Sequence, residues 1–216
     1  GFNGRISDMN ALTIMIRNPV LGKVKTRLAK GVGEEEALRI YHILLARTRV
    51  AALAVQVRKM LFYSDYIETN DLFFNHLFEK YTQQGSGLGE RMEAAFATAF
   101  AQGASKVLII GSDCPGLSGD LLHRAYRLLD RHDFVLGPTE DGGYYLLSMK
   151  QPAPALFHDM EWSTETVLQA TQEKIAALGS SSALLPVLLD IDTEEDWKKW
   201  NESFRKNAPD IGRSSI

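Results

Sequence analysis

The sequence predicts one α/β domain whose central, mostly parallel sheet is covered by helices on both faces, giving three layers. Short apolar runs alternate along the chain with longer amphipathic segments, a pattern typical of strands connected by helices. The run at 107–110, Val-Leu-Ile-Ile, is aliphatic without interruption, as expected for a strand that is buried on both faces. A length of 216 residues suits a single large domain of this class.

The elements follow from local patterns taken in chain order. Apolar runs predict strands at 12–16, 55–63, 107–110, 133–138, 144–149 and 184–189. Apolar residues at helical spacing predict helices at 34–53, 71–78, 118–132 and 163–178, one after the glycines of 85–89, and a last one opening near Thr193. The apolar stripe of 34–53 consists of Ala37, Ile40, Tyr41, Leu44, Leu45, Thr48, Ala51 and Ala52.

Two helix starts carry side chains suited to capping. Ser163 or Thr164 is the expected N-cap of the helix at 163–178. Thr193 and Asp196 resemble a capping box in which Asp replaces Glu, and they predict the start of the last helix.

The chain shows no internal repeat and no linker that divides it. We expect a flexible N-terminus or a cloning remnant at 1–10, because these residues lack periodicity and do not begin with methionine. The domain is expected to span 11–204. The polar segment 205–216 is expected to be a flexible tail.

Composition excludes several classes of protein. Hydrophobic residues make up 45% of the chain, enough for a sizeable core. The net charge of −3 argues against a nucleic-acid binder, and no apolar run approaches the roughly 18 residues of a membrane span. The single cysteine, Cys114, cannot form an internal disulfide. With no signal peptide visible, these features predict a cytoplasmic protein.

Asp113 stands just past the strand predicted at 107–110. In open α/β sheets ligands bind outside the carboxyl ends of the strands. A lone Asp at that edge can hold a divalent cation, which in turn holds phosphates. Alternatively, Asp113 caps the following turn or helix. The residues alone leave both interpretations open.

A basic cluster follows the first predicted strand. Lys23, Lys25 and Arg27 fall within five residues of an otherwise acidic protein. At least two of these cations converge whether the stretch is extended or helical. The functional interpretation is a phosphate clamp, and the alternative is a solvated basic loop.

The stretch 85–89 holds three glycines, which allow a backbone to approach a ligand closely. Arg91 follows in the first turn of the next helix, where a cation opposes the helix dipole. A bound anion would remove this conflict, and Glu90 and Glu93 also relieve it in part. The glycine spacing does not match the dinucleotide-binding fingerprint, so no nicotinamide cofactor is expected.

Asp141 and Gly142 separate two strand-like runs and are a strong hairpin signal. Glu140 and Asp141 also place two acids in one loop, where they could serve an acceptor or a metal-bound leaving group.

Five stretches, in order, resemble a known family. They are Arg17-Asn18-Pro19 with Gly22 and 24–28, 87–92, 111–117, 141–145 and 190–193. Over residues 12–200 the chain resembles the bacterial glycosyltransferase-like proteins called rSAM/selenodomain-associated, within the nucleotide-diphospho-sugar transferase superfamily. The resemblance implies a Rossmann-like glycosyltransferase A fold, a nucleotide-activated sugar as substrate and a divalent cation, Mg²⁺ or Mn²⁺.

Residue roles follow from the resemblance and the patterns together. Asp113 and Asp141 are the catalytic candidates, and Asp113 and Asp192 are the candidate metal ligands. The candidates for nucleotide and phosphate binding are Arg17, Lys23, Lys25, Arg27, Gly87, Gly89 and Arg91.

One departure from the family pattern concerns the reaction. The usual metal motif of such glycosyltransferases is Asp-x-Asp, whereas this chain has a single Asp113 followed by Cys114-Pro115. That arrangement is similar to the nucleotidylyltransferases, although their Gly-Gly-x-Ser-x-Arg loop is absent here. We therefore consider three functions. The resemblance favours glycosyl transfer to a small-molecule acceptor. The alternatives are nucleotidyl transfer from a nucleoside triphosphate to a phosphorylated acceptor and non-catalytic binding of a nucleotide sugar.

Overall fold

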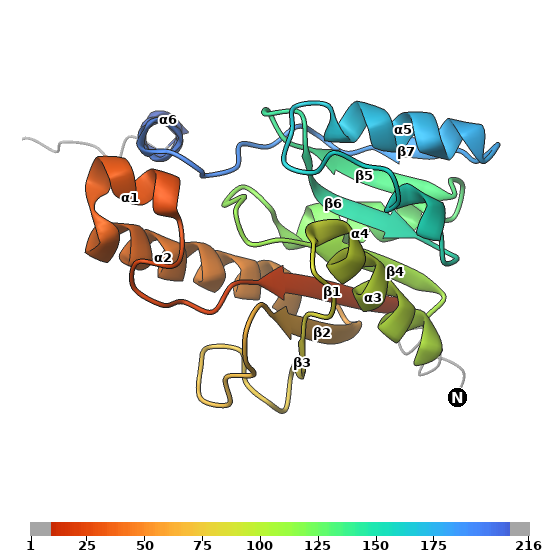
Figure 1. Ribbon diagram of the computed structural model, residues 1–216, viewed down its shortest axis with the longest axis horizontal. Coiled ribbons are helices and arrows are strands. Elements are labelled where there is room, and N and C mark those ends of the chain that lie inside the picture. The colour runs from red at the N-terminus through yellow and green to blue at the C-terminus, as the bar shows by residue number, and fades with distance from the viewer. Residues whose placement is uncertain (1–9, 208–216) are drawn as a thin grey trace, which may run out of the picture.

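The computed structural model describes residues 10–207, which form three layers with a seven-stranded sheet in the middle (Figure 1). The strands are β1 (Asn10–Ile16), β2 (Arg58–Tyr63), β3 (Glu79–Thr82), β4 (Lys106–Ile110), β5 (Phe134–Pro138), β6 (Tyr144–Met149) and β7 (Ser182–Leu184). The helices are α1 (Thr26–Val32), α2 (Glu34–Leu53), α3 (Leu88–Ala101), α4 (Gly119–Leu128), the 3-10 turn η2 (Pro154–Leu156), α5 (Val167–Ala177) and α6 (Glu194–Asn207). The predicted fold class is confirmed.

The sheet is mostly parallel, as predicted. Its strand order is β3-β2-β1-β4-β6-β5-β7, and each neighbouring pair is parallel except the two that include β6. Because β6 runs antiparallel between β4 and β5, the carboxyl ends of the six other strands all meet at one edge of the sheet. In open α/β sheets this is the edge where ligands bind.

Apolar side chains form a core on each face of the sheet. One core lies against α1, α2 and α4, with α6 packed at its margin, and the other lies against α3 and α5. The strand β4 serves both: Leu108 and Ile110 belong to the first core, and Val107 and Ile109 to the second. The stripe predicted for α2 is buried along its whole length.

The last helix begins with the capping box predicted from the sequence. Asp196 Oδ2 accepts from the Thr193 N–H at 2.9 Å, and the Asp196 N–H donates to Thr193 Oγ1 at 3.3 Å. Trp197 and Trp200 pack against the core next to α1 and α2. The cap therefore fixes where the chain turns from the carboxyl edge of the sheet into α6.

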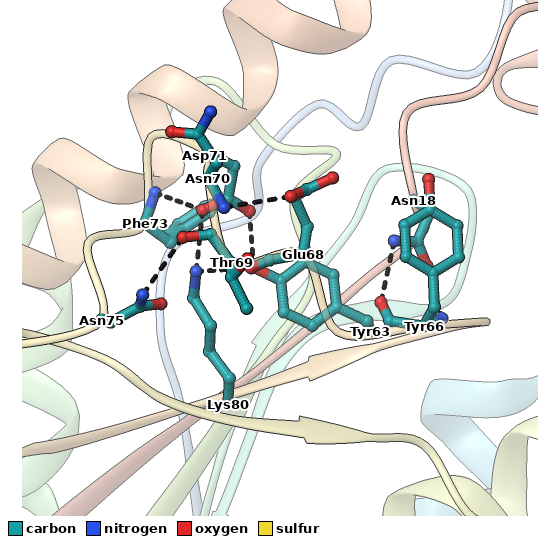
Figure 2. Close-up of polar contacts among 10 residues, drawn as sticks. All are labelled: Asn18, Tyr63, Tyr66, Glu68, Thr69, Asn70, Asp71, Phe73, Asn75 and Lys80. Carbon is teal, nitrogen blue, oxygen red and sulfur yellow. Dashed lines mark hydrogen bonds and ion pairs between the residues drawn. The ribbon is translucent and has the colours of Figure 1, made fainter.

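The prediction of a helix at 71–78 is wrong, because the β2–β3 connection (residues 64–78) consists of bends and a turn. The Asp71 carboxylate stops a helix by accepting from the Phe73 N–H at 3.0 Å. It also accepts from Tyr63 Oη at 2.5 Å and from Lys80 Nζ at 3.0 Å (Figure 2). Lys80 lies in β3, an edge strand that the sequence pattern did not predict.

Other boundaries differ by a few residues. The helix α4 ends at Leu128, and β7 is a short strand followed by an isolated bridge between Thr139 and Leu188. The start of α5 was predicted wrongly, since Thr166 is its N-cap and Ser163 has a left-handed backbone with φ 62°.

The predicted terminal segments fall mostly outside the described residues. The strand β1 begins at Asn10, and α6 extends to Asn207. Residues 1–9 and 208–216 are not described. Between residues 10 and 207, no helix combines the length and the apolar character that crossing a membrane requires.

Candidate functional site

Asp113 lies just beyond β4, at the edge where the strands' carboxyl ends meet. Its Oδ1 is 2.6 Å from Lys25 Nζ. The two side chains differ in exposure, since 8% of Lys25 and 52% of Asp113 remain accessible to solvent. The cap of α4 is Ser118, whose side chain accepts from the Leu121 N–H. The alternative role of Asp113 as the cap of that helix therefore belongs to Ser118.

Lys25 is held firmly against Asp113. It precedes α1 with φ 51° and ψ 46°, a left-handed conformation that residues other than glycine seldom adopt. Its neighbours Val24 and Leu28 are buried in the core, and Lys25 Nζ donates a second bond to the Ile191 carbonyl at 2.6 Å. Backbone strain of this kind is characteristic of positions whose side chain has a functional role.

The segment 190–192, between β7 and α6, crosses the site beside β4. Its middle residue, Ile191, is fully buried, and the Ile191 N–H donates to the Asp113 carbonyl at 2.9 Å. Ile191 is thus bonded to both members of the Lys25–Asp113 pair. This attachment carries Asp190 into the site, although the sequence pointed to Asp192.

Asp190 and Asp141 form a carboxyl pair near Asp113. Burial raises the pKa of Asp190 to about 7, and the charge of Asp141, a hydrogen bond between the two carboxyl groups and the charge of Asp113 act in the same direction. Like charges this close disfavour double ionisation. The pair therefore retains a proton up to about neutral pH, and a bound cation would displace this proton to water or to a base.

Asp141 also shapes its own turn. Its Oδ1 accepts from Thr139 Oγ1 at 2.5 Å and from the Gly143 N–H at 3.1 Å. At Gly142, φ is 90°, and a Cβ there would lie 2.0 Å from the Glu165 carbonyl oxygen, so a side chain does not fit. The hairpin interpretation is thus confirmed by the β5–β6 pairing, while Asp141 still contacts Asp190.

Asp192, the predicted metal ligand, pairs with Arg27 just before α6. Its carboxylate accepts from Arg27 at 3.0 Å in an exposed ion pair, and its N–H donates to Asp196 Oδ2 at 3.0 Å. Asp192 already belongs to the start of α6, where the chain changes direction. Of the two acids in the 190–193 motif, the structure therefore favours Asp190 for the site.

The remaining cations lie along the loop after β1. Lys23 is exposed, with its N–H bonded to the Val20 carbonyl at 3.0 Å. Arg17 is exposed too, and its backbone is fixed by Tyr41, whose Oη donates to the Arg17 carbonyl at 2.8 Å. Burial raises the pKa of Tyr41 to about 12, so it remains a donor.

Asn18 joins the ends of β1 and β2. It is 2% exposed; its Nδ2 donates to the Tyr66 carbonyl at 2.9 Å, and its Oδ1 accepts from the Asp65 N–H at 3.0 Å. The site edge is therefore bonded to the β2–β3 connection, as Figure 2 shows for Asn18 and Tyr66.

The glycine-containing loop is braced by Arg91. Its Nε donates to the Gly85 carbonyl at 3.0 Å, and its Nη1 donates to Gln83 Oε1 at 3.2 Å. Gln83 in turn donates to the Ile16 and Phe62 carbonyls, at the ends of β1 and β2. Gln83 thus links the glycine-containing loop to the ends of β1 and β2, a connection that no sequence motif indicated.

Two of the predicted glycines have different reasons to be glycine. At Gly89, a Cβ would lie 2.5 Å from the Trp162 indole nitrogen, so packing between α3 and the segment before α5 requires it. At Gly87, the N-cap of α3, a Cβ would meet no atom within 4 Å. The Glu90 carboxylate already accepts from the Ser86 N–H at 2.7 Å, from Ser86 Oγ at 2.9 Å and from the Gly87 backbone, so an acidic side chain occupies this helix start.

The carboxylates suit a hard divalent cation. Among residues 10–207, no group of three or more His, Cys, Asp or Glu side chains is arranged to hold a metal ion. Mg²⁺, however, is commonly held by one or two carboxylates together with substrate phosphates and waters. Half-exposed Asp113 and the adjacent Asp190 provide such oxygen ligands. Cys114 is not a competing ligand, because it is buried and burial raises its thiol pKa.

Comparison with known proteins supports the fold and indicates a family. The family model described as "Uncharacterized protein conserved in bacteria (DUF2064)" matches residues 47–164, more than half of the chain. A search of curated protein sequences gave no match.

Solved structures give close and distant similarities. A "putative nucleotide-diphospho-sugar transferase" from Desulfovibrio desulfuricans G20 is 27% identical, with a TM-score of 0.85 over 95% of this chain and 92% of that one. The 4-diphosphocytidyl-2C-methyl-D-erythritol synthase of Anaerococcus prevotii is 11% identical, with a TM-score of 0.60 over 92% and 99%. Rv0371c from Mycobacterium tuberculosis H37Rv, solved with manganese, is 12% identical, with a TM-score of 0.53 over 90% and 99%.

Proposed function

We propose that this chain, which belongs to the DUF2064 family, is a metal-dependent transferase that takes a nucleotide-activated sugar and transfers the glycosyl group to a small-molecule acceptor. The observation that carries the proposal is the half-exposed Asp113, which is backed by buried Lys25 at the carboxyl end of β4. The similarity to the Desulfovibrio protein supports the same substrate class.

Each candidate site residue would have a role that depends on its position in the site. Asp113 and Asp190 would hold Mg²⁺ or Mn²⁺, and such a cation binds phosphate oxygens and stabilises the negative charge on a leaving diphosphate. Lys25 and Arg27 would bind the phosphates as charged donors. Gly87, at the start of α3, would offer its backbone N–H to an anion once the Glu90 carboxylate moves away from it. Asp141 would orient the acceptor or receive its proton while keeping Asp190 in place.

Nucleotidyl transfer is the second candidate. A single acid followed by x-Pro favours it, and so does the fold shared with the Anaerococcus synthase. In that reaction the same phosphate and cation groups would act on a nucleoside triphosphate, and pyrophosphate would leave. A binding protein that holds the nucleotide sugar without turnover uses these groups as well.

A thermal-shift panel of nucleotides and nucleotide sugars, with and without Mn²⁺ or Mg²⁺, tests the proposal. A ligand at a hundred times its Kd stabilises the native state by about 2.7 kcal/mol, which raises Tm by about 5–10 °C for a chain of this length. We expect a nucleoside-diphosphate sugar to give such a shift with the cation present. A panel without any cation-dependent shift would contradict the proposal.

Product analysis then separates the reactions. Release of a nucleoside diphosphate from a sugar donor supports glycosyl transfer. Release of pyrophosphate from a triphosphate supports nucleotidyl transfer instead. Binding without either product supports the non-catalytic alternative.

A further inference from the structure

We infer that the site takes its divalent cation and its phosphates together, as a metal–phosphate complex, because Lys25 excludes the free cation from Asp113. The inference rests on the proposed function and deepens it: it names the metal complex, rather than the separate nucleotide, as the ligand. It assigns Lys25 two alternative partners, the Asp113 carboxylate and a phosphate.

The geometry of the Lys25–Asp113 pair places an ammonium group beside the carboxylate that a cation would bind. Lys25 Nζ lies 2.6 Å from Asp113 Oδ1, within the distance of a strong charge-assisted hydrogen bond. A dication bound to the same carboxylate would lie within a few ångströms of the ammonium group, where like charges repel strongly. Lys25 therefore competes with a cation for Asp113.

Lys25 cannot simply withdraw into water when a cation approaches. Its side chain is 8% exposed, its backbone is fixed at the start of α1, and its second bond goes to the Ile191 carbonyl. An ammonium group that loses its carboxylate in such a place needs another anionic partner, because a buried charge left unpaired is costly. A free cation supplies no such partner.

A phosphate supplies the anionic partner that Lys25 needs. An ammonium group has three donors and binds phosphate as a point charge. Asp113 is 52% exposed, so a ligand can reach this pair from solvent. When a metal–phosphate complex arrives, the cation takes Asp113 while the phosphate takes Lys25, and both charges remain paired.

The test measures Mn²⁺ alone and Mn²⁺ with inorganic pyrophosphate on the full chain, by calorimetry or by electron paramagnetic resonance. In Lys25→Ala, losing a charge-assisted bond should tighten free Mn²⁺ binding by about tenfold or more and weaken binding of the Mn²⁺–pyrophosphate complex by a similar factor. The two affinities are expected to move in opposite directions, which general loss of structure cannot produce. Lys25→Gln keeps part of the side-chain stem and should show the same pattern if the alanine variant folds poorly.

Lys30→Ala is the matched control, because it removes one positive charge at an exposed position of α1, the helix that Lys25 precedes. Both affinities should stay near those of the parent. The inference is overturned if free Mn²⁺ binds both Lys25 variants no more tightly than it binds the parent. Failure of the proposed function gives a different result, in which no nucleotide or nucleotide sugar of the panel binds the parent.

Discussion

Two lysine–aspartate pairs, each with a buried lysine, have different surroundings. In the Lys25–Asp113 pair the atoms are 2.6 Å apart, and 52% of the aspartate side chain is exposed. In the Lys80–Asp71 pair they are 3.0 Å apart, and 17% of the aspartate is exposed. The first pair lies at the carboxyl edge of the sheet, and the second closes the β2–β3 connection.

The partners of each carboxylate explain the difference. Asp71 accepts from Tyr63, Lys80 and the Phe73 N–H, so both of its oxygens are used (Figure 2). Asp113 has one oxygen on Lys25 and more than half of its side chain in solvent. A saturated carboxylate stabilises the fold, whereas an accessible one backed by a cation can bind a ligand. Partners and exposure, rather than the ion pair itself, therefore distinguish the candidate site aspartate, Asp113, from the structural one, Asp71.

Asp71→Asn should give the largest loss of stability. The substitution removes the negative charge and leaves Lys80, which is 6% exposed, without its charged partner. Breaking a buried ion pair from one side costs about 3–5 kcal/mol. Urea unfolding measures this change in the free energy of unfolding. Nucleotide affinity of the folded variant should stay near the parent value, and a stability loss below about 1 kcal/mol would contradict the structural role.

Asp113→Asn makes the same substitution at the other pair. Here we expect a small loss of stability and a large loss of nucleotide binding. Because solvent reaches the half-exposed Asp113 more readily than the enclosed Asp71, the loss of stability should be smaller than that of Asp71→Asn. The Mn²⁺-dependent part of nucleotide binding should disappear, because the amide cannot replace a charged metal ligand. A Mn²⁺ titration at fixed nucleotide concentration measures this. Undiminished Mn²⁺ enhancement would remove Asp113 from the site and leave Asp141 and Asp190 as candidates.

Much of the fold could be predicted from the sequence, because its signals are local. The stripe of α2, the aliphatic run of β4, the Asp141-Gly142 turn and the Thr193–Asp196 cap each depend on neighbours within one element. The β2–β3 connection could not be predicted in the same way. Its aromatic residues suit a helix, but Asp71 is bonded to Tyr63 and Lys80, which lie eight and nine residues away on two strands.

The site could be predicted in part. Asp113 and Lys25 follow strand ends, and the structure brings them together. Asp190 could not be told apart from Asp192 by sequence, since both follow the same apolar run. Burial of Ile191 and the α6 cap decide which acid meets Asp141, and both are tertiary features. The role of Gln83 in linking two strand ends could not be predicted, because its hydrogen bonds go to backbone carbonyls of two other strands.

Asp190→Asn should change the pH dependence of stability. The pKa of Asp190 is raised to about 7 in the folded protein, against about 3.9 for an unfolded aspartate. Between these values the folded state holds the extra proton, so the stability of the parent falls as pH rises from about 4 to about 7. The asparagine variant should lack this fall, and its stability relative to the parent should increase with pH.

Urea unfolding at a series of pH values, in the presence of a chelator, measures the two profiles. Asp192→Asn is the matched control, because that carboxylate lies two residues away in an exposed pair with Arg27. Its profile should run parallel to that of the parent. A parallel profile for Asp190→Asn as well would mean that the Asp141–Asp190 pair does not retain its proton.

Arg27→Ala should have the smallest effect on stability and extends the comparison to a third pair. Arg27 and Asp192 are 3.0 Å apart, but 72% and 45% of their side chains are exposed, so water screens the attraction. Such surface pairs contribute about 0.2–1 kcal/mol, and the loss should shrink further in salt. If Arg27 binds phosphate, nucleotide affinity should nevertheless fall by about tenfold at low salt. Unchanged affinity would make Arg27 a surface residue of α1 and leave the phosphates to Lys25.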